Sequence, residues 1–263
     1  MQKADFTLSL SLPEYLLQVT GMDNFTLSGI KMQGCRGGGI EIVNGNRCFI
    51  QDCELRQFGQ RAIHINVGTE NCVNGFVLEN LGLDGIRLIG GNRHTLEPSN
   101  HKVTNTVVHN FSLYKRTYQP AIYVEGVGLT RSNNLFAESS SSAMRIEANE
   151  CLIEYNQNFH VVTESDDQGG LDMFYNYALR GNVICYNHWR DIRGATHWGS
   201  AGVRFDDLIS DQLVYGNVFE NVGGGHFGGV QIHGGKDNLI ENNLFYNCSK
   251  AVSFSLERTV VGD

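Results

Sequence analysis

Four aspartates in the second half of the chain have the residue type and spacing for paired acid–base chemistry. Asp166 and Asp172 lie on either side of a glycine pair in TESDDQGGLD, and Asp206 and Asp207 are consecutive in RFDD. Carboxyl groups that share a surface can divide the roles of general acid and of base or nucleophile, because charge and burial shift their pKa values. We take these four aspartates as the catalytic candidates.

The elements that must position these aspartates are nine short repeats, each a small residue followed by alternating apolar and polar positions. Such alternation is typical of a β-strand whose second and fourth residues enter a core while the third and fifth face outward. The repeats are GIEIV at 39–43, AIHIN at 62–66, GIRLI at 85–89, AIYVE at 121–125, AMRIE at 143–147, GLDMF at 170–174, GVRFD at 202–206, GVQIH at 229–233 and AVSFS at 251–255.

Successive repeats begin 22 to 36 residues apart, which fits one coil of a solenoid per repeat, with insertions in some coils. A unit this short must stack on its neighbours, so equal positions align about 4.8 Å apart. We predict an all-β fold, a single-stranded right-handed parallel β-helix of nine to ten rungs, in one domain spanning 1–263. The alternative for the domain organisation is a fragment of a longer protein that lacks a terminal cap.

Two rows of polar residues support this register. The strings LIEYN, VICYN, LVYGN and LIENN align Asn156, Asn187, Asn217 and Asn243, and we expect their amides to hydrogen-bond along the stack. A second row falls near a turn and comprises Asn80, Asn110, Asp191, Asn221 and Asn247. The seven cysteines lack CxxC spacing and are expected to be core thiols.

The outward positions of the aligned repeats predict a groove. Its candidate binding residues on the strands are Arg87, Tyr123, Glu125, Arg145, Glu147, Arg204, Gln231 and His233. Insertions GNRHTLEPSN, YKRTYQP, TESDDQGG, RGATHWGS and GGGHFGG are all expected before the same strand, where they would wall the groove. They add the binding candidates Asp167, His197, Trp198 and His226.

The register also predicts which charges meet. Asp172 should lie between Arg145 and Arg204, which would lower its pKa and keep it ionised. Asp206 should lie about 8 Å from Asp172 between Cα atoms, within the carboxyl range of inverting glycosidases. Glu125 and Glu147 should be neighbours, either as a like-charge pair or splayed toward solvent and the loop cations Lys115 and Arg116.

Composition narrows the partners. A formal charge of -8 argues against a general nucleic-acid binder, and no long apolar span indicates a membrane protein. The first residues lack the pattern of a signal peptide. No histidine spacing indicates zinc, so we expect no metal or cofactor, with Ca²⁺ at the aspartate-rich turns as a weak alternative.

The strings TYQPAIYVEG, SSAMRIE, VVTESDDQGGLDMFYN, AGVRFDD and GGVQIHGGKDNLIENNLF resemble those of β-helix glycoside hydrolases similar to family 141. The organisation over 16–256 also resembles the right-handed β-helices of pectate lyases and polygalacturonases. The family resemblance implies fucosidase- or xylanase-type action, a secreted or periplasmic location, and Asp166 and Asp207 as catalytic residues. The register instead favours Asp172 and Asp206, so all four are kept.

Three functions follow as hypotheses. The first is a glycoside hydrolase acting on a polysaccharide or oligosaccharide through an aspartate acid–base pair. The second is a polysaccharide lyase in which Lys115 or Arg116 removes a proton beside a uronate. The third is a noncatalytic carbohydrate-binding or structural β-helix. The sequence leaves the sugar, the linkage, the stereochemical outcome and the oligomeric state open.

Overall fold

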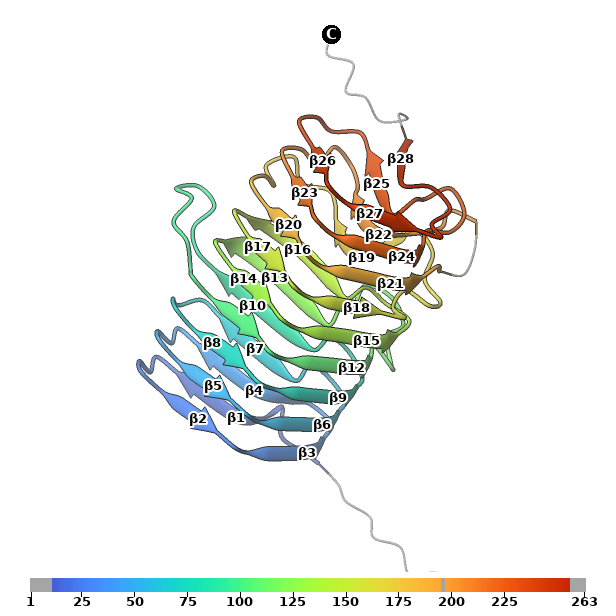
Figure 1. Cartoon of the computed structure of the whole chain (residues 1–263). Coiled ribbons are helices and arrows are strands. Elements are labelled where there is room, and N and C mark those ends of the chain that lie inside the picture. Colours follow the sequence, from blue (N-terminus) through green and yellow to red (C-terminus); the bar gives the residue numbers. More distant parts are fainter. Residues whose placement is uncertain (1–10, 195–196, 256–263) are drawn as a thin grey trace, which may run out of the picture.

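The computed structural model describes residues 11–194 and 197–255. These residues wind into stacked coils that form three parallel sheets (Figure 1). The predicted right-handed parallel β-helix is confirmed. The outermost parts of the predicted domain, 1–10 and 256–263, and residues 195–196 lie outside the described residues. Within the described ranges there is no helix long and apolar enough to cross a membrane.

The first sheet contains the pentapeptide repeats, paired in chain order. Its strands are β1 (Tyr15–Thr20), β4 (Gly38–Val43), β7 (Ile63–Asn66), β10 (Ile86–Gly90), β13 (Ile122–Val127), β16 (Met144–Asn149), β19 (Gln168–Met173), β22 (Ser200–Phe205), β25 (Val230–His233) and β28 (Val252–Ser255). The pattern of nine repeats missed β1, because Leu16 occupies the position of the small residue that precedes each alternating segment.

The other two sheets complete each coil. The second contains β2 (Thr26–Ser28), β5 (Phe49–Gln51), β8 (Cys72–Asn74), β11 (Lys102–Thr104), β14 (Thr130–Ser132), β17 (Leu152–Glu154), β20 (Val183–Cys185), β23 (Leu213–Tyr215) and β26 (Leu239–Glu241). The third contains β3 (Lys31–Cys35), β6 (Glu54–Phe58), β9 (Val77–Leu81), β12 (Val107–Phe111), β15 (Leu135–Ser139), β18 (Gln157–Phe159), β21 (His188–Ile192), β24 (Val218–Val222) and β27 (Leu244–Tyr246).

The core runs along the axis of the coils as columns of equal positions. Ile63, Ile86 and Ile122 are direct partners on consecutive strands, and all three are fully buried. The seven cysteines are free thiols, five of them buried, in line with their prediction as core residues. Burial of these stacked apolar columns is the main favourable term in the folding of the coils.

The predicted asparagine ladder is confirmed. Asn156, Asn187 and Asn217 each donate their side-chain amide to the next asparagine oxygen, at 2.9, 3.0 and 3.0 Å. The same oxygens accept backbone N–H groups of the preceding rung. The ladder extends one rung earlier to Asn134, which the repeated string did not include. These bonds satisfy buried polar groups at the turn between the second and third sheets.

The second polar row, predicted near a turn, lies at the ends of third-sheet strands, in β9, β12, β21 and β24 and directly after β27. All five of its members have positive φ between 51° and 59°, and they are Asn80, Asn110, Asp191, Asn221 and Asn247. Asn and Asp tolerate this left-handed conformation better than other residues with a side chain. Side-chain bonds join Asn247 to Asn221 at 2.6 Å and Asn221 to Asp191 at 2.8 Å.

One insertion, segment 91–101, lies at the C-terminal ends of the first-sheet strands, whereas it was predicted at their N-terminal ends. Segments 112–121, 160–167, 193–199 and 223–229 precede first-sheet strands as expected, but 91–101 follows β10 and leads into β11 (Figure 1). A second long connection at the C-terminal ends, 174–182, was not predicted. Arg93 joins the two by donating to Asn176 at 3.2 Å and to Asn149 of β16 at 2.9 Å. Long loops therefore lie at both ends of the first-sheet strands.

Replacing Asn187 with alanine should lower the free energy of unfolding by about 2–4 kcal/mol, because the buried Asn156 N–H groups and the Ile153 carbonyl lose their partner. Urea denaturation measures this change. The matched control is Gln157→Ala at an exposed position of β18, which should change stability by less than about 0.5 kcal/mol. Equal stabilities for the two variants would contradict a structural role for the ladder.

Candidate functional site

One pocket on the first sheet lies over β22 and β25 and has a volume of about 600 Å³. We call it the acid pocket because three aspartates line it. Its lining residues are Asp167, Trp198, Arg204, Asp206, Asp207, His226, Phe227, Gln231, His233, Lys250, Phe254 and Ser255. Six of the predicted binding residues are brought together here with the catalytic candidates Asp206 and Asp207.

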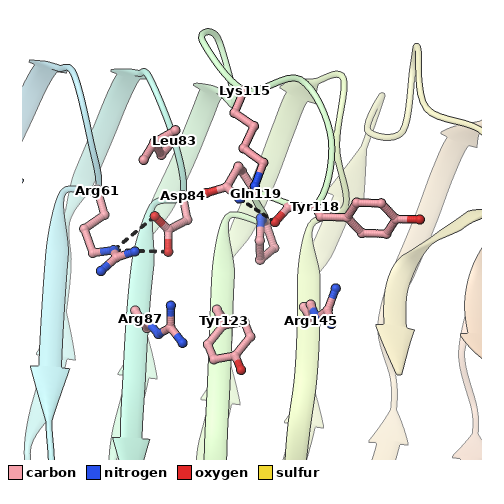
Figure 2. A pocket seen from close by; sticks show the side chains of 10 residues that line it. Arg61, Leu83, Asp84, Arg87, Lys115, Tyr118, Gln119, Tyr123 and Arg145 are labelled. Atoms are coloured by element: carbon pink, nitrogen blue, oxygen red, sulfur yellow. Dashed lines mark hydrogen bonds and ion pairs between the residues drawn. The ribbon is translucent and has the colours of Figure 1, made fainter. Parts of the chain in front are cut away.

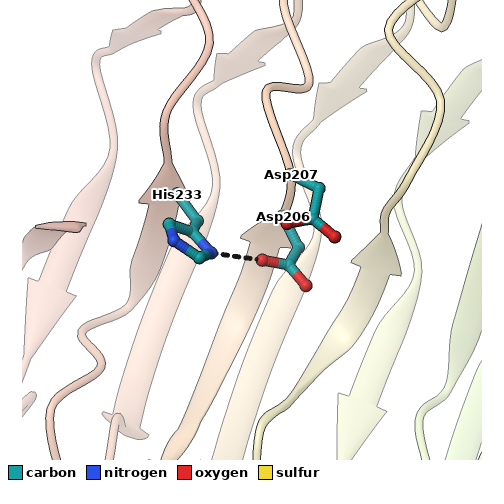
Figure 3. Close-up of side chains that lie close together, drawn as sticks. All are labelled: Asp206, Asp207 and His233. Carbon is teal, nitrogen blue, oxygen red and sulfur yellow. Dashed lines mark hydrogen bonds and ion pairs between the residues drawn. The ribbon is translucent and has the colours of Figure 1, made fainter. Parts of the chain in front are cut away.

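Asp206 and Asp207 face the same pocket although they are consecutive. The strand β22 ends at Phe205, and Asp207 has a φ of 50°, which turns the chain out of the extended conformation. Adjacent residues of an extended strand would point to opposite faces. Figure 3 shows both carboxylates on one side, and an oxygen of each lies within 4.8 Å of the other and of a His233 ring nitrogen.

Arg204 is the centre of the charge network. Its Nη2 donates to Asp206 and to Asp167 at 2.7 Å each, and its Nη1 donates to Asp172 at 3.3 Å and to the Asp167 carbonyl at 2.9 Å. The residue is only 4% exposed. The guanidinium thus bonds Asp167, Asp172 and Asp206 while it also lines the acid pocket, and its direct binding of substrate stays a prediction.

Asp172 occupies its predicted register opposite Arg204, but it does not face solvent. It is 1% exposed, and its Oδ2 has no hydrogen-bond partner within the described part of the chain. Burial raises the pKa of the Asp172 carboxyl, against the lowering effects of Arg204 and Arg145. The predicted lowering of this pKa is wrong, because alternation alone did not reveal that this rung is covered.

Asp167 is a carboxyl of the acid pocket whose pKa is shifted by its surroundings. Its side chain is 48% exposed, and it accepts from the same Arg204 nitrogen as Asp206, so the two carboxylates lie side by side. Burial raises the pKa of Asp167, the nearby Asp206 and Asp166 raise it further, and Arg204 opposes the shift. A carboxyl with a raised pKa beside an acidic neighbour suits proton donation.

Asp206 is held from two sides. Its Oδ2 accepts from Arg204, and its Oδ1 lies 2.6 Å from His233 Nδ1 (Figure 3). These contacts fix the orientation of the carboxylate on the wall of the pocket. Gln231, which is 1% exposed, donates to Ser255 at 3.0 Å and thereby forms part of the same wall.

Asp166 supports a loop and does not line the acid pocket. Its carboxylate accepts the backbone N–H groups of Trp198 and Gly199 at 3.1 and 2.6 Å. Gly199 has a φ of 114°, and a Cβ there would lie 1.7 Å from the Gly224 carbonyl oxygen, so only glycine fits between the two loops. Asp166, a catalytic candidate from the sequence, thus positions the backbone of Trp198.

Aromatic side chains form the mouth of the acid pocket. The His197 ring lies 5.2 Å from that of Trp198 and 5.7 Å from that of His226, measured between centroids. Trp198 is 54% exposed, and both it and His226 line the pocket. An exposed indole beside polar rings is a suitable platform for the apolar face of a sugar.

The second pocket lies over β10, β13 and β16 and has a volume of about 310 Å³. We call it the cationic pocket, and Figure 2 shows its lining residues Arg61, Leu83, Asp84, Arg87, Lys115, Tyr118, Gln119, Pro120, Tyr123 and Arg145. The surface that was predicted as one groove is thus divided into the acid pocket and the cationic pocket. Between them, the Arg145 guanidinium lies 3.8 Å from the centre of the Phe174 ring.

Glu125 and Glu147 are direct neighbours on β13 and β16, as the register predicts. Arg145 donates to Glu147 at 3.0 Å, and the Tyr123 hydroxyl lies 3.5 Å from Glu125. Of the loop cations considered as alternative partners, Arg116 instead pairs with the loop residue Glu164. Burial and the two glutamates raise the pKa of Tyr123.

Asp206, Asp207 and His233 are also the described residues with the spacing to hold a metal ion, although the sequence predicted no metal site. Asp206 already accepts from Arg204 and His233. A cation would have to take the place of the His233 hydrogen bond and share its ligand with a guanidinium. This donor set therefore fits an internal charge network better than a dedicated metal site.

Comparisons with known proteins were made for the whole chain. No protein-family profile matches it, and no curated protein does. Among solved structures it is similar to an alginate lyase from Paenibacillus sp. str. FPU-7, at 10% identity over 91% of this chain and 99% of that chain, with a TM-score of 0.46. A second is a variant catalytic domain of GH87 alpha-1,3-glucanase in complex with tetrasaccharides, at 10% identity over 88% of this chain and 54% of that chain, with a TM-score of 0.26.

Both structures are of carbohydrate-active enzymes, but likeness at this level carries no argument about the activity of this chain. The resemblance to glycoside hydrolase family 141 stays a prediction. The absence of a cofactor, the location outside the cell and the roles of the individual site residues also stay predictions.

Asp172→Asn provides a test of the buried charge. Because the folded-state pKa of Asp172 is raised above 3.8, the wild type loses stability as pH rises from about this value to the folded-state pKa. The free energy of unfolding of the variant, minus that of the wild type, should therefore grow with pH and then level off. Urea titrations between pH 3 and pH 7 measure it, and a difference that shrinks with rising pH would mean that Arg204 dominates over burial.

Proposed function

We propose that the chain is a glycoside hydrolase that cleaves a polysaccharide or oligosaccharide in the acid pocket. The observation that carries this proposal is the convergence of Asp167, Asp206 and Asp207 on one concave site with an exposed aromatic platform. Glycoside hydrolysis requires two carboxyl groups with different protonation states flanking the scissile bond. The pocket offers such groups together with a surface for the sugar.

The proposed mechanism gives each carboxyl a separate role. Asp167, whose pKa is raised, donates a proton to the glycosidic oxygen as the bond to the anomeric carbon breaks. One of the two other pocket carboxylates, Asp206 or Asp207, attacks the anomeric carbon or removes a proton from the attacking water. Arg204 and His233 keep Asp206 in place during these steps.

Asp206→Asn and Asp207→Asn should each lower kcat by about 10²- to 10⁴-fold, because each removes a base or nucleophile from the pocket. Asp167→Asn should lower kcat by a similar factor on natural glycans but by much less on aryl glycosides, whose leaving group needs little protonation. It should also remove the loss of activity at high pH that the deprotonation of Asp167 causes. Reducing-end release measures all three variants on the substrates found by a polysaccharide screen.

The matched control is Asp237→Asn, which changes an exposed aspartate in a turn beyond β25. Its activity should equal that of the wild type within twofold. Full activity in Asp206→Asn and Asp207→Asn would refute the assignment of the acid pocket. Saturable glycan binding without turnover by the wild type would instead support the noncatalytic alternative.

A polysaccharide lyase is the second candidate, favoured by the position of Lys115. This residue lies in the cationic pocket with Arg87 and Tyr123, so a base and a cation for a uronate carboxylate are close together. Arg116, the other predicted base, is paired with Glu164. The two functions therefore use different pockets.

The two candidates give different products and different sensitive residues. Hydrolysis adds water to the products, whereas elimination produces an unsaturated sugar that absorbs ultraviolet light. For the hydrolase, Lys115→Gln should retain kcat on the cleaved glycan, while the aspartate variants lose it. Ultraviolet-absorbing products that disappear in Lys115→Gln and persist in Asp207→Asn would replace the hydrolase assignment with the lyase.

A further inference from the structure

The cationic pocket has a charge opposite to that of the whole molecule. Four cationic side chains, Arg61, Arg87, Lys115 and Arg145, line it together with one carboxylate, Asp84, in a chain with a formal charge of -8. Random placement of basic residues on an acidic protein would not gather four of them around one concavity. The pocket is therefore a local source of positive potential.

The charges that remain for a ligand can be identified from the ion pairs. Arg61 donates to both oxygens of Asp84 at 3.1 and 3.3 Å, and Arg145 pairs with Glu147 at 2.9 Å. Within residues 11–194 and 197–255, no carboxylate oxygen lies within 4.0 Å of a side-chain nitrogen of Arg87 or Lys115. These two cations are available to an external anion.

Arg87 is also prepared for binding. Its guanidinium carbon lies 4.2 Å from the centre of the Tyr123 ring, and the residue is half-buried on the central strand β10. Stacking of this kind fixes the plane of the guanidinium while its N–H groups remain free to donate. A preorganised fork loses less entropy when it binds a carboxylate or a sulfate.

The two pockets lie along one direction of the same sheet. Arg87 of the cationic pocket is on β10, Lys115 precedes β13, and Arg204 of the acid pocket is on β22. Three to four inter-strand steps separate the two cations from Arg204, a distance of about 14–19 Å. A glycan chain lying along the axis of the coils would contact both.

We propose that the cationic pocket binds an acidic substituent of the substrate, a carboxylate or a sulfate ester, on a sugar about three to four rungs from the bond that is cleaved. The substrate is then an anionic glycan, held by Arg87 and Lys115 at one end and positioned in the acid pocket at the other. This inference rests on the proposed function for the position of cleavage. Binding of the anionic group requires no turnover and is tested separately.

Calorimetric titration of the Asp207→Asn protein, in which turnover is blocked, tests the inference with defined probes. These are oligogalacturonate and oligoalginate, the same chains after carboxyl reduction, and sulfated galactan oligosaccharides. At least one acidic probe should bind, and its reduced or desulfated form should bind about tenfold more weakly. Preference for the uronate or the sulfated probes distinguishes the two sources of the anion.

Substitutions then locate the binding. Arg87→Gln should raise the Kd of the acidic probe about tenfold and leave that of the neutral probe unchanged, and Arg87→Lys should restore part of the affinity because it keeps the charge but loses the planar fork. The matched control is Lys102→Gln, which removes an exposed positive charge on β11 in another sheet and should change the Kd by less than twofold. Thermal denaturation verifies that the variants are folded.

Three results would overturn the inference: no binding of any acidic probe, equal affinity for acidic and neutral chains, or equal losses in Arg87→Gln and Lys102→Gln. Binding that depends on Arg87 without hydrolysis of any probe by the wild type would support anion binding in the cationic pocket and contradict the proposed function. Hydrolysis of a neutral glycan that is insensitive to Arg87→Gln would support the proposed function and contradict the role of the cationic pocket.

Discussion

The structure depends on the in-register stacking of coils through backbone hydrogen bonds. Each first-sheet strand pairs in parallel with the same segment of the next coil, so residues at equal positions become direct neighbours. Columns of isoleucine fill the core, and columns of asparagine satisfy the buried groups of a turn. Both pockets are places where these columns meet the loops at the edges of the sheet.

The acid pocket has one cation that allows several carboxylates to lie close together. Three aspartates bond to Arg204, and without this charge their mutual repulsion would raise their pKa values or push them apart. Asp172 adds a buried negative charge behind the guanidinium, which holds it against the sheet. Such a pair contributes little net stability after desolvation, but it fixes the position of the groups that face the ligand.

The fold and part of the site follow from the sequence. Alternation and repeat length predict the strands, their register and the columns that include Glu125, Glu147 and Asp172. Burial of Asp172 and the split of the groove do not follow, because they depend on how loops fold over the sheet. The place of segment 91–101 was also missed, since a count of residues between repeats does not tell at which corner of a coil the insertion lies.

The distance between the two pockets is set by the number of coils between them. Each coil contributes one inter-strand step of about 4.8 Å, whatever its side chains are. Duplication or loss of a coil between β13 and β22 would change the distance by one such step while leaving both pockets intact. The number of coils thus determines the spacing between the pockets, and this spacing can change in evolution without changes in the residues of either pocket.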